Sequence, residues 1–117
     1  MSIYASVYTY EDGAGVPRLG TIVRRIYGQG HGVTCHMARV DGSGEDVISG
    51  SRTQRLVCRY QLHRNKNEAP KGHTTWPFTV KRRVAGSYDW FGNAHSAAQA
   101  MEQIVTHERA VHGGAEV

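Results

Sequence analysis

Hydrophobic and polar residues alternate along much of this 117-residue chain with a period of two, which is typical of half-buried β-strands. The pattern predicts strands over residues 2–10, from Gly32 onward, and over 46–49, 54–63, 76–84 and 86–92. The 14 glycines agree with this interpretation, because short strands require many tight turns. We therefore predict an antiparallel sheet of about five to six strands.

The first predicted strand is apolar or aromatic on both sides. Its alternation places Ile3, Ala5 and Val7 on one side and Tyr4, Tyr8 and Tyr10 on the other. Such a strand is either covered on both sides within the fold or lies at a subunit contact. Because tyrosine is favoured at interfaces, we predict these three tyrosines as interface residues of a homo-oligomer.

Two later strands alternate between apolar and basic positions. In residues 54–63 the inward positions are Leu56, Cys58, Tyr60 and Leu62, and the outward ones are Arg55, Arg59, Gln61 and His63, with Val57. In residues 76–84 one face carries Trp76, Phe78, Val80 and Val84, and the other carries Thr79, Lys81 and Arg83. If the two strands pair, their basic positions share one face of the sheet.

Residues 17–27 have an ambiguous pattern. Their apolar positions have helical spacing, and Pro17 would suit a first helical turn. Gly20 and the β-branched residues around it favour a strand instead. We predict a short helix here, with a strand as the alternative.

The clearest helix is predicted over residues 94–112, capped by Asn93 or Ser96. Its apolar stripe consists of Ala97, Ala100, Met101, Ile104, Val105 and Val111. The chain is long enough for one domain with a modest core. We therefore predict a single α+β domain over residues 1–117, in which the C-terminal helix packs on one face of the sheet.

Charge is unevenly distributed along the chain. The net charge is +4, yet residues 47–83 contain nine Lys and Arg residues and a single acid, Glu68, while the remainder carries −4. A segregated charge of this kind presents a basic face to a partner or keeps the protein soluble.

The basic strands suggest contact with nucleic acid, either DNA or RNA. Side chains two residues apart along a strand are separated by roughly 7 Å, which suits successive phosphates of one nucleic-acid strand. The predicted phosphate-binding residues are Arg55, Arg59, His63, Lys81 and Arg83, with Arg64, Lys66 and Lys71 of the following loop at the margin. The alternative is a solvated or protein-binding face. In the sequence from Tyr88 to Phe91, either Trp90 or Phe91 must point outward, where it could stack on a base.

Other chemistries have weaker support. Strand alternation sends Cys35 away from His36 and Cys58 away from His63, so we predict no metal site and no cofactor. No nucleophilic triad or carboxylate pair is recognisable, and we expect no enzymatic activity. Without a visible signal peptide, the two cysteines indicate reduced thiols in the cytoplasm. No apolar run approaches the roughly 20 residues that a membrane span requires.

Two short resemblances support a binding role. The segment "SYDWFGNAHSAAQAMEQI" looks like the last strand and helix of small DNA-binding domains of the AP2 and integrase arm-binding types. The sequence from Gly50 to Val84 resembles the RNA-facing strands of single-stranded RNA phage coat proteins. That family has two C-terminal helices, whereas this chain has room for one. The competing function is a structural or protein-interaction module of viral or mobile-element origin, which assembles like a coat or inhibits a host protein.

Overall fold

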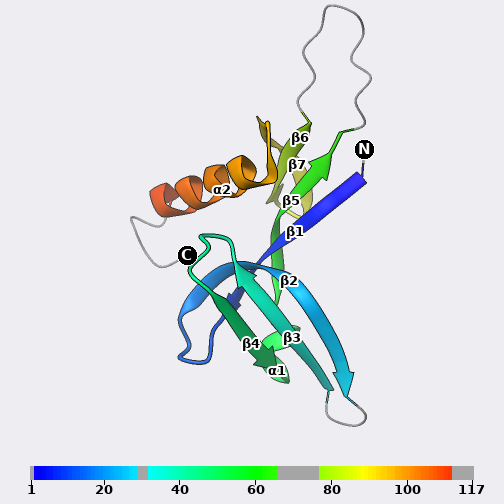
Figure 1. Ribbon diagram of the computed structural model, residues 1–117, viewed down its shortest axis with the longest axis vertical. Coiled ribbons are helices and arrows are strands. Elements are labelled where there is room, and N and C mark those ends of the chain that lie inside the picture. The colour runs from blue at the N-terminus through cyan, green and yellow to red at the C-terminus, as the bar shows by residue number, and fades with distance from the viewer. Residues whose placement is uncertain (1, 29–31, 66–76, 112–117) are drawn as a thin grey trace, which may run out of the picture.

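The computed structural model describes residues 2–28, 32–65 and 77–111. In this part of the chain seven strands and two helices follow one another (Figure 1). They are β1 (Ser2–Glu11), β2 (Pro17–Gly28), β3 (Gly32–Arg39), β4 (Glu45–Ser49), α1 (Ser51–Gln54), β5 (Val57–Arg64), β6 (Phe78–Val84), β7 (Ser87–Ala94) and α2 (Ala97–Val111). The predicted α+β class with an antiparallel sheet is confirmed, but the sheet has seven strands rather than five or six.

The strands form one sheet in the order β4-β3-β2-β1-β5-β6-β7, and every neighbouring pair is antiparallel. The first strand is thus central, with one meander on each side of it. In Figure 1 the β2–β4 half lies in the lower part, and the β5–β7 half lies in the upper part beside α2.

The prediction of a short helix over residues 17–27 is wrong, because this segment forms the long strand β2. The apolar residues of β2 have the spacing of a helix because they lie on both faces of the sheet. Leu19 lies in one hydrophobic cluster, and Ile22 packs against the other. Position 20 has no room for a side chain, because the neighbouring strands approach it closely. A Cβ at this position would lie 2.7 Å from the carbonyl oxygen of Ala38 and 2.9 Å from the Tyr10 ring.

The two hydrophobic clusters lie on opposite faces of the sheet, as adjacent residues of β1 show. Val7 belongs to the first cluster, whereas Tyr8 packs against the second. The first cluster includes Val7, Leu19, Tyr60, Leu62, Val80, Ala100 and Ile104. The second consists of Tyr10, Cys35, Met37 and Ile48, with Leu56 packed against it.

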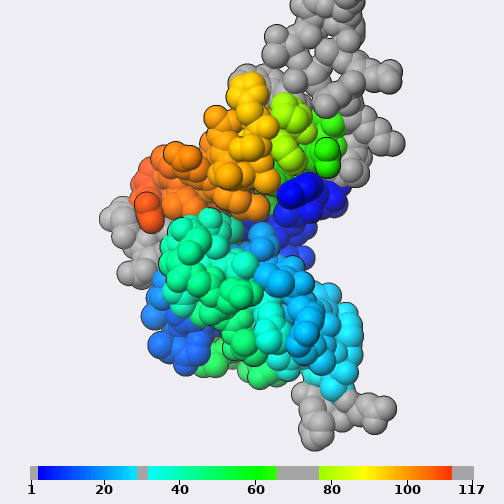
Figure 2. Space-filling model, viewed as in Figure 1, coloured from blue at the N-terminus to red at the C-terminus, as the bar shows by residue number. Residues whose placement is uncertain are grey.

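Each helix covers one half of one face. Helix α2 packs on β5, β6 and β7, on the side that we call the helix face, while α1 contacts β1, β3 and β4. Val40, which follows β3, also packs against the first cluster, so the two halves of the molecule meet beside α2 (Figure 2). Two parts of the sheet remain uncovered by the described helices: the side of β5–β7 opposite α2, and the helix face of β2–β4.

The C-terminal helix begins at Ala97 rather than residue 94, and Ser96 caps it as predicted. The Ser96 hydroxyl oxygen accepts the Gln99 backbone N–H at 3.1 Å, and the Gln99 side-chain oxygen accepts the His95 backbone N–H at 2.7 Å. This reciprocal pair satisfies two backbone donors at the start of the helix. The predicted stripe packs against the sheet as far as Val105, but Val111 is 60% exposed.

The sequence predicts Tyr10 at a subunit interface, but Tyr10 is a core residue and only 4% exposed. Its hydroxyl donates to Asp46 Oδ2 at 2.6 Å, and Arg39 donates two hydrogen bonds to the same carboxylate at 2.8 and 2.9 Å. These bonds tie β1 to β3 and β4, and the Arg39 guanidinium holds the pKa of Asp46 at about 2. Tyr10 therefore joins strands inside the fold instead of forming a subunit contact.

Candidate nucleic-acid interface

The uncovered side of β5–β7 collects most of the basic residues that the alternation predicted to share a face. Gln61 lies opposite Lys81, His63 opposite Thr79, Lys81 opposite Trp90, and Arg83 opposite Tyr88. Directly opposed residues of an antiparallel pair project to the same side. We call this surface the open face; it carries His63, Lys81, Arg83, Tyr88 and Trp90, with Gln61, Thr79 and Asn93 between them.

Strand β5 bulges at Arg59. Val7 pairs with Tyr60 and Tyr8 with Cys58, so Arg59 has no opposing residue on β1. A bulge bends the strand locally and redirects its side chains. Arg59 is exposed at this bulge, where the interrupted alternation no longer assigns its side chain to the open face.

Two cations of the open face, Lys81 and Arg83, and Arg59 at the neighbouring bulge are available to a ligand. Arg59 and Arg83 are exposed and Lys81 is half-buried. Within the described ranges, no carboxylate forms an ion pair with any of them, whereas Arg39 pairs with Asp46 at 2.8 Å and Arg55 with Glu11 at 3.9 Å. An unpaired surface cation remains free to neutralise a phosphate.

His63 lies on the predicted side but cannot supply charge there. It is only 9% exposed, and its Nε2 lies 2.9 Å from Gln61 Oε1. Burial lowers the pKa of its imidazole, and the nearby charge of Lys81 lowers this pKa further. The ring is therefore neutral at pH 7 and serves as a buried polar group.

The remaining predicted phosphate ligands lie elsewhere. Arg55 caps the C-terminal end of α1, before β5 begins, and so is not part of the sheet. Arg64 lies opposite Phe78, whose ring packs on the first cluster, and this places Arg64 toward the helix face. Lys66 and Lys71 lie outside the described residues. The structure thus groups Lys81 and Arg83 out of the predicted set, with His63 buried beside them and Arg59 at the bulge of the neighbouring strand.

Two tyrosines remain from the predicted interface on β1. Tyr4 is 53% exposed, and its ring meets the edge of the Phe78 ring at a centroid distance of 5.2 Å. Tyr8 is half-buried and packs against the second cluster. Of the three tyrosines, Tyr4 alone offers a largely exposed ring to a partner.

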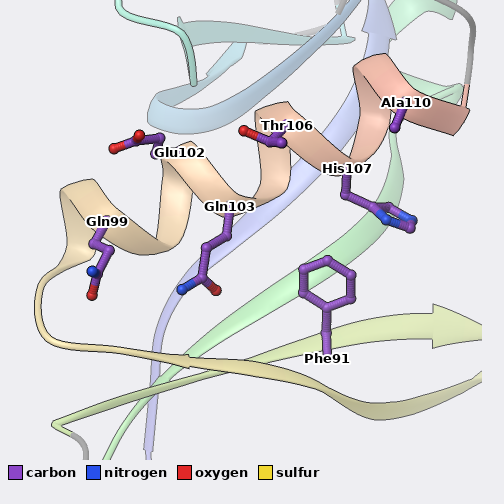
Figure 3. A pocket seen from close by; sticks show the side chains of 7 residues that line it. All are labelled: Phe91, Gln99, Glu102, Gln103, Thr106, His107 and Ala110. Atoms are coloured by element: carbon purple, nitrogen blue, oxygen red, sulfur yellow. The ribbon is translucent and has the colours of Figure 1, made fainter.

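Trp90 is the exposed aromatic residue of the open face, with 65% of its surface accessible. The register between β6 and β7 shifts at this point: Val80 pairs with Gly92, but Lys81 pairs with Trp90, which leaves Phe91 as an extra residue. Phe91 points to the helix face, where its ring lies 4.8 Å from that of His107 and 5.8 Å from that of Tyr60 (Figure 3). Of the two aromatics that the sequence left as alternatives, Trp90 points outward.

Neither a protein-family model nor any curated protein or solved structure matches this chain. Among the described residues, no helix has the length and apolar character that a membrane crossing demands. The same residues include no group of three or more His, Cys, Asp or Glu side chains placed to hold a metal ion. Function therefore has to be inferred from the geometry of the surface.

A groove of about 650 Å³ runs along the outer side of α2, on the helix face (Figure 3). Phe91 forms its floor, and Gln99, Gln103, Thr106 and His107 lie around it. Two of its polar groups already have partners: Gln103 donates to the Asn93 carbonyl at 2.8 Å, and His107 Nε2 lies 2.7 Å from Arg82 Nη1. Because arginine can only donate, His107 Nε2 is the acceptor of this bond. These bonds attach α2 to the sheet.

Proposed function

We propose that this protein is a non-enzymatic nucleic-acid-binding protein that holds the phosphate backbone on its open face. The observation that carries the proposal is the grouping of Lys81 and Arg83 around the exposed Trp90, on a part of the sheet that no described helix covers. A basic surface interleaved with an aromatic ring suits a polyanion that also carries flat bases.

The contacts support binding with little sequence preference. Lysine and arginine reach phosphate oxygens from a sheet surface, and such contacts position a protein without reading bases. The basic residues of the open face have no described acidic partner, so binding a phosphate would not require an existing ion pair to break. The affinity should then depend strongly on salt, because each neutralised phosphate releases counterions.

The salt dependence of binding tests this proposal. Polarisation of a fluorescein-labelled single-stranded 20-mer, measured from about 50 to 200 mM salt, should give a log–log slope of about −2, the value for three phosphate contacts on a single strand. DNA and RNA versions of the same sequence should give similar slopes. Absence of binding at the lowest salt, or an affinity independent of salt, would contradict the proposal.

A second function, assembly of two copies, is favoured by the uncovered helix face of β2–β4. Val47 is 59% exposed there, and the cross-strand row Arg24–His36–Val47 lies beside Ile26. Glu45, opposite Ala38, supplies an acid on the same face. A two-fold axis along β3 would lay β2 of one copy over β4 of the other. Arg24 would then approach Glu45, and the apolar side chains would be covered together.

The mass of the protein in solution tests this assembly. At about 100 μM, light scattering coupled to gel filtration should give a dimer for the wild type and a monomer for Val47→Lys, because a lysine ammonium would replace an apolar contact and would face the like charge of Arg24 of the other copy. Val111→Lys is the matched control, since Val111 is similarly exposed but lies at the end of α2, and it should remain dimeric. A monomeric wild type would contradict assembly without affecting the nucleic-acid proposal.

A further inference from the structure

We propose that Trp90 is a base-stacking platform and that the open face is suited to single-stranded nucleic acid with unpaired bases. This inference rests on the proposed function and specifies its ligand. Isolated hydrophobic residues on a surface are common and need no explanation. Trp90 is different because neighbouring strands hold its ring in place and because cations flank it.

A chain of hydrogen bonds across three strands fixes the indole. Trp90 Nε1 donates to Asn93 Oδ1 at 3.2 Å, and the Thr79 hydroxyl donates to the same oxygen at 3.3 Å. Thr79 in turn accepts a hydrogen bond from Asn65 Nδ2 at 2.8 Å, and Asn65 follows β5. The ring is therefore oriented before any ligand arrives, which reduces the entropy lost on binding.

The hydrogen bond to Asn93 also determines which contacts the indole ring can make with a ligand. The indole N–H is the only hydrogen-bonding group of a tryptophan side chain, and in this structure it is engaged. What remains exposed is the π-surface, which cannot read the hydrogen-bonding edges of bases but can stack on their faces. In a duplex these faces are covered by adjacent base pairs, so an extended or looped single strand is the form that presents them.

The cations are placed to hold the backbone of such a strand. Lys81 lies directly across from Trp90 on β6, and Arg83 is the next residue along β6 on the same side. Tyr88, opposite Arg83, reaches across β6 to donate to the Cys58 carbonyl at 3.4 Å, so its ring lies along the sheet beside Arg83. Same-face residues of a strand are about 7 Å apart, which lets adjacent side chains contact successive phosphates while one base rests on the indole.

Three fluorescein-labelled probes of equal length separate stacking from phosphate contact. They are a single-stranded deoxythymidine 12-mer, an abasic 12-mer with the same number of phosphates, and a 12-bp duplex. The wild type should bind the thymidine strand at least about tenfold more tightly than the abasic strand, as expected for one stacked base. It should also prefer the single strand to the duplex at equal salt.

The variant Trp90→Ala should lose this tenfold advantage while its affinity for the abasic strand and its salt dependence stay unchanged. Trp90→Phe, which keeps a smaller aromatic ring, should recover most of the advantage, and circular dichroism should show that both variants are folded. If Trp90→Ala binds the thymidine strand as well as the wild type, or if the wild type binds all three probes equally, stacking is overturned while phosphate binding stands. If no probe binds the wild type, the proposed function itself fails.

Discussion

The double charge reversal Lys81→Glu plus Arg83→Glu is expected to weaken binding of a single-stranded oligonucleotide by at least about 100-fold near 50 mM salt. Both side chains project from the open face, and no described carboxylate pairs with them. The change removes two attractions and adds two repulsions, each worth roughly 1 kcal/mol at contact distance in water. Even after screening, the total exceeds the roughly 2.7 kcal/mol that corresponds to a 100-fold change.

The variant Arg52→Glu plus Arg55→Glu is the matched control. It changes the net charge of the protein by the same amount, but its two positions lie in and directly after α1, which packs on the β1–β4 part of the sheet. Its affinity should stay within about threefold of the wild type, since distant exposed charges are largely screened. If the two double variants lose affinity equally, then overall charge governs binding and the open face has no special role. Thermal unfolding of each variant verifies that both are folded.

Strands and helices were predictable from the sequence wherever a single periodic pattern of apolar residues determined the structure. Period-two alternation indicated β1 and β5, and the serine before an amphipathic run indicated the start of α2. The segment that forms β2 was not predictable in this way, because it contributes apolar residues to both faces and its register shifts after Ile22. A bulge changes the period of a strand, and alternate residues then no longer report the same face.

The open face was predictable in part. Alternation placed Lys81 and Arg83 together, because both lie on one side of β6, but it does not place Arg59, which lies at a bulge of β5. It failed for Arg55, because the chain forms a helical turn up to Gln54 and the strand begins only at Val57. The burial of His63 could not be predicted either, because it depends on packing between neighbouring strands.

The outward orientation of Trp90 required the structure as well. Trp90 and Phe91 are adjacent aromatics, and either could occupy the core from composition alone. The shift in register between β6 and β7 inserts Phe91 as an extra residue, and the Tyr60 and His107 rings then receive it on the helix face. The exposure of Trp90 is therefore a consequence of how Phe91 packs.

The variant Tyr60→Ala is expected to reduce the free energy of unfolding by about 4 kcal/mol, as large-to-small changes of buried aromatics do. Tyr60 is completely buried, its ring lies edge-on to Phe91 and His107, and its hydroxyl donates to Glu108 of α2. The ring therefore connects the strand that carries Arg59 to the helix that covers the other face. A domain of this size has a total stability of roughly 5–15 kcal/mol, so the loss should be evident as a much lower urea midpoint.

Two tyrosine variants separate the contribution of the ring from that of its hydroxyl and from general effects of substitution. Tyr60→Phe keeps the packing and should cost only about 1 kcal/mol, the value of one side-chain hydrogen bond. Tyr27→Ala removes a ring that is 71% exposed and should change stability by less than about 0.5 kcal/mol. Urea unfolding followed by far-ultraviolet circular dichroism gives all three values. A Tyr60→Ala protein as stable as Tyr27→Ala would mean that α2 is not held to the sheet by this residue. Another interaction would then have to hold α2 on this face of the sheet, which leaves the opposite side of β5–β7 open.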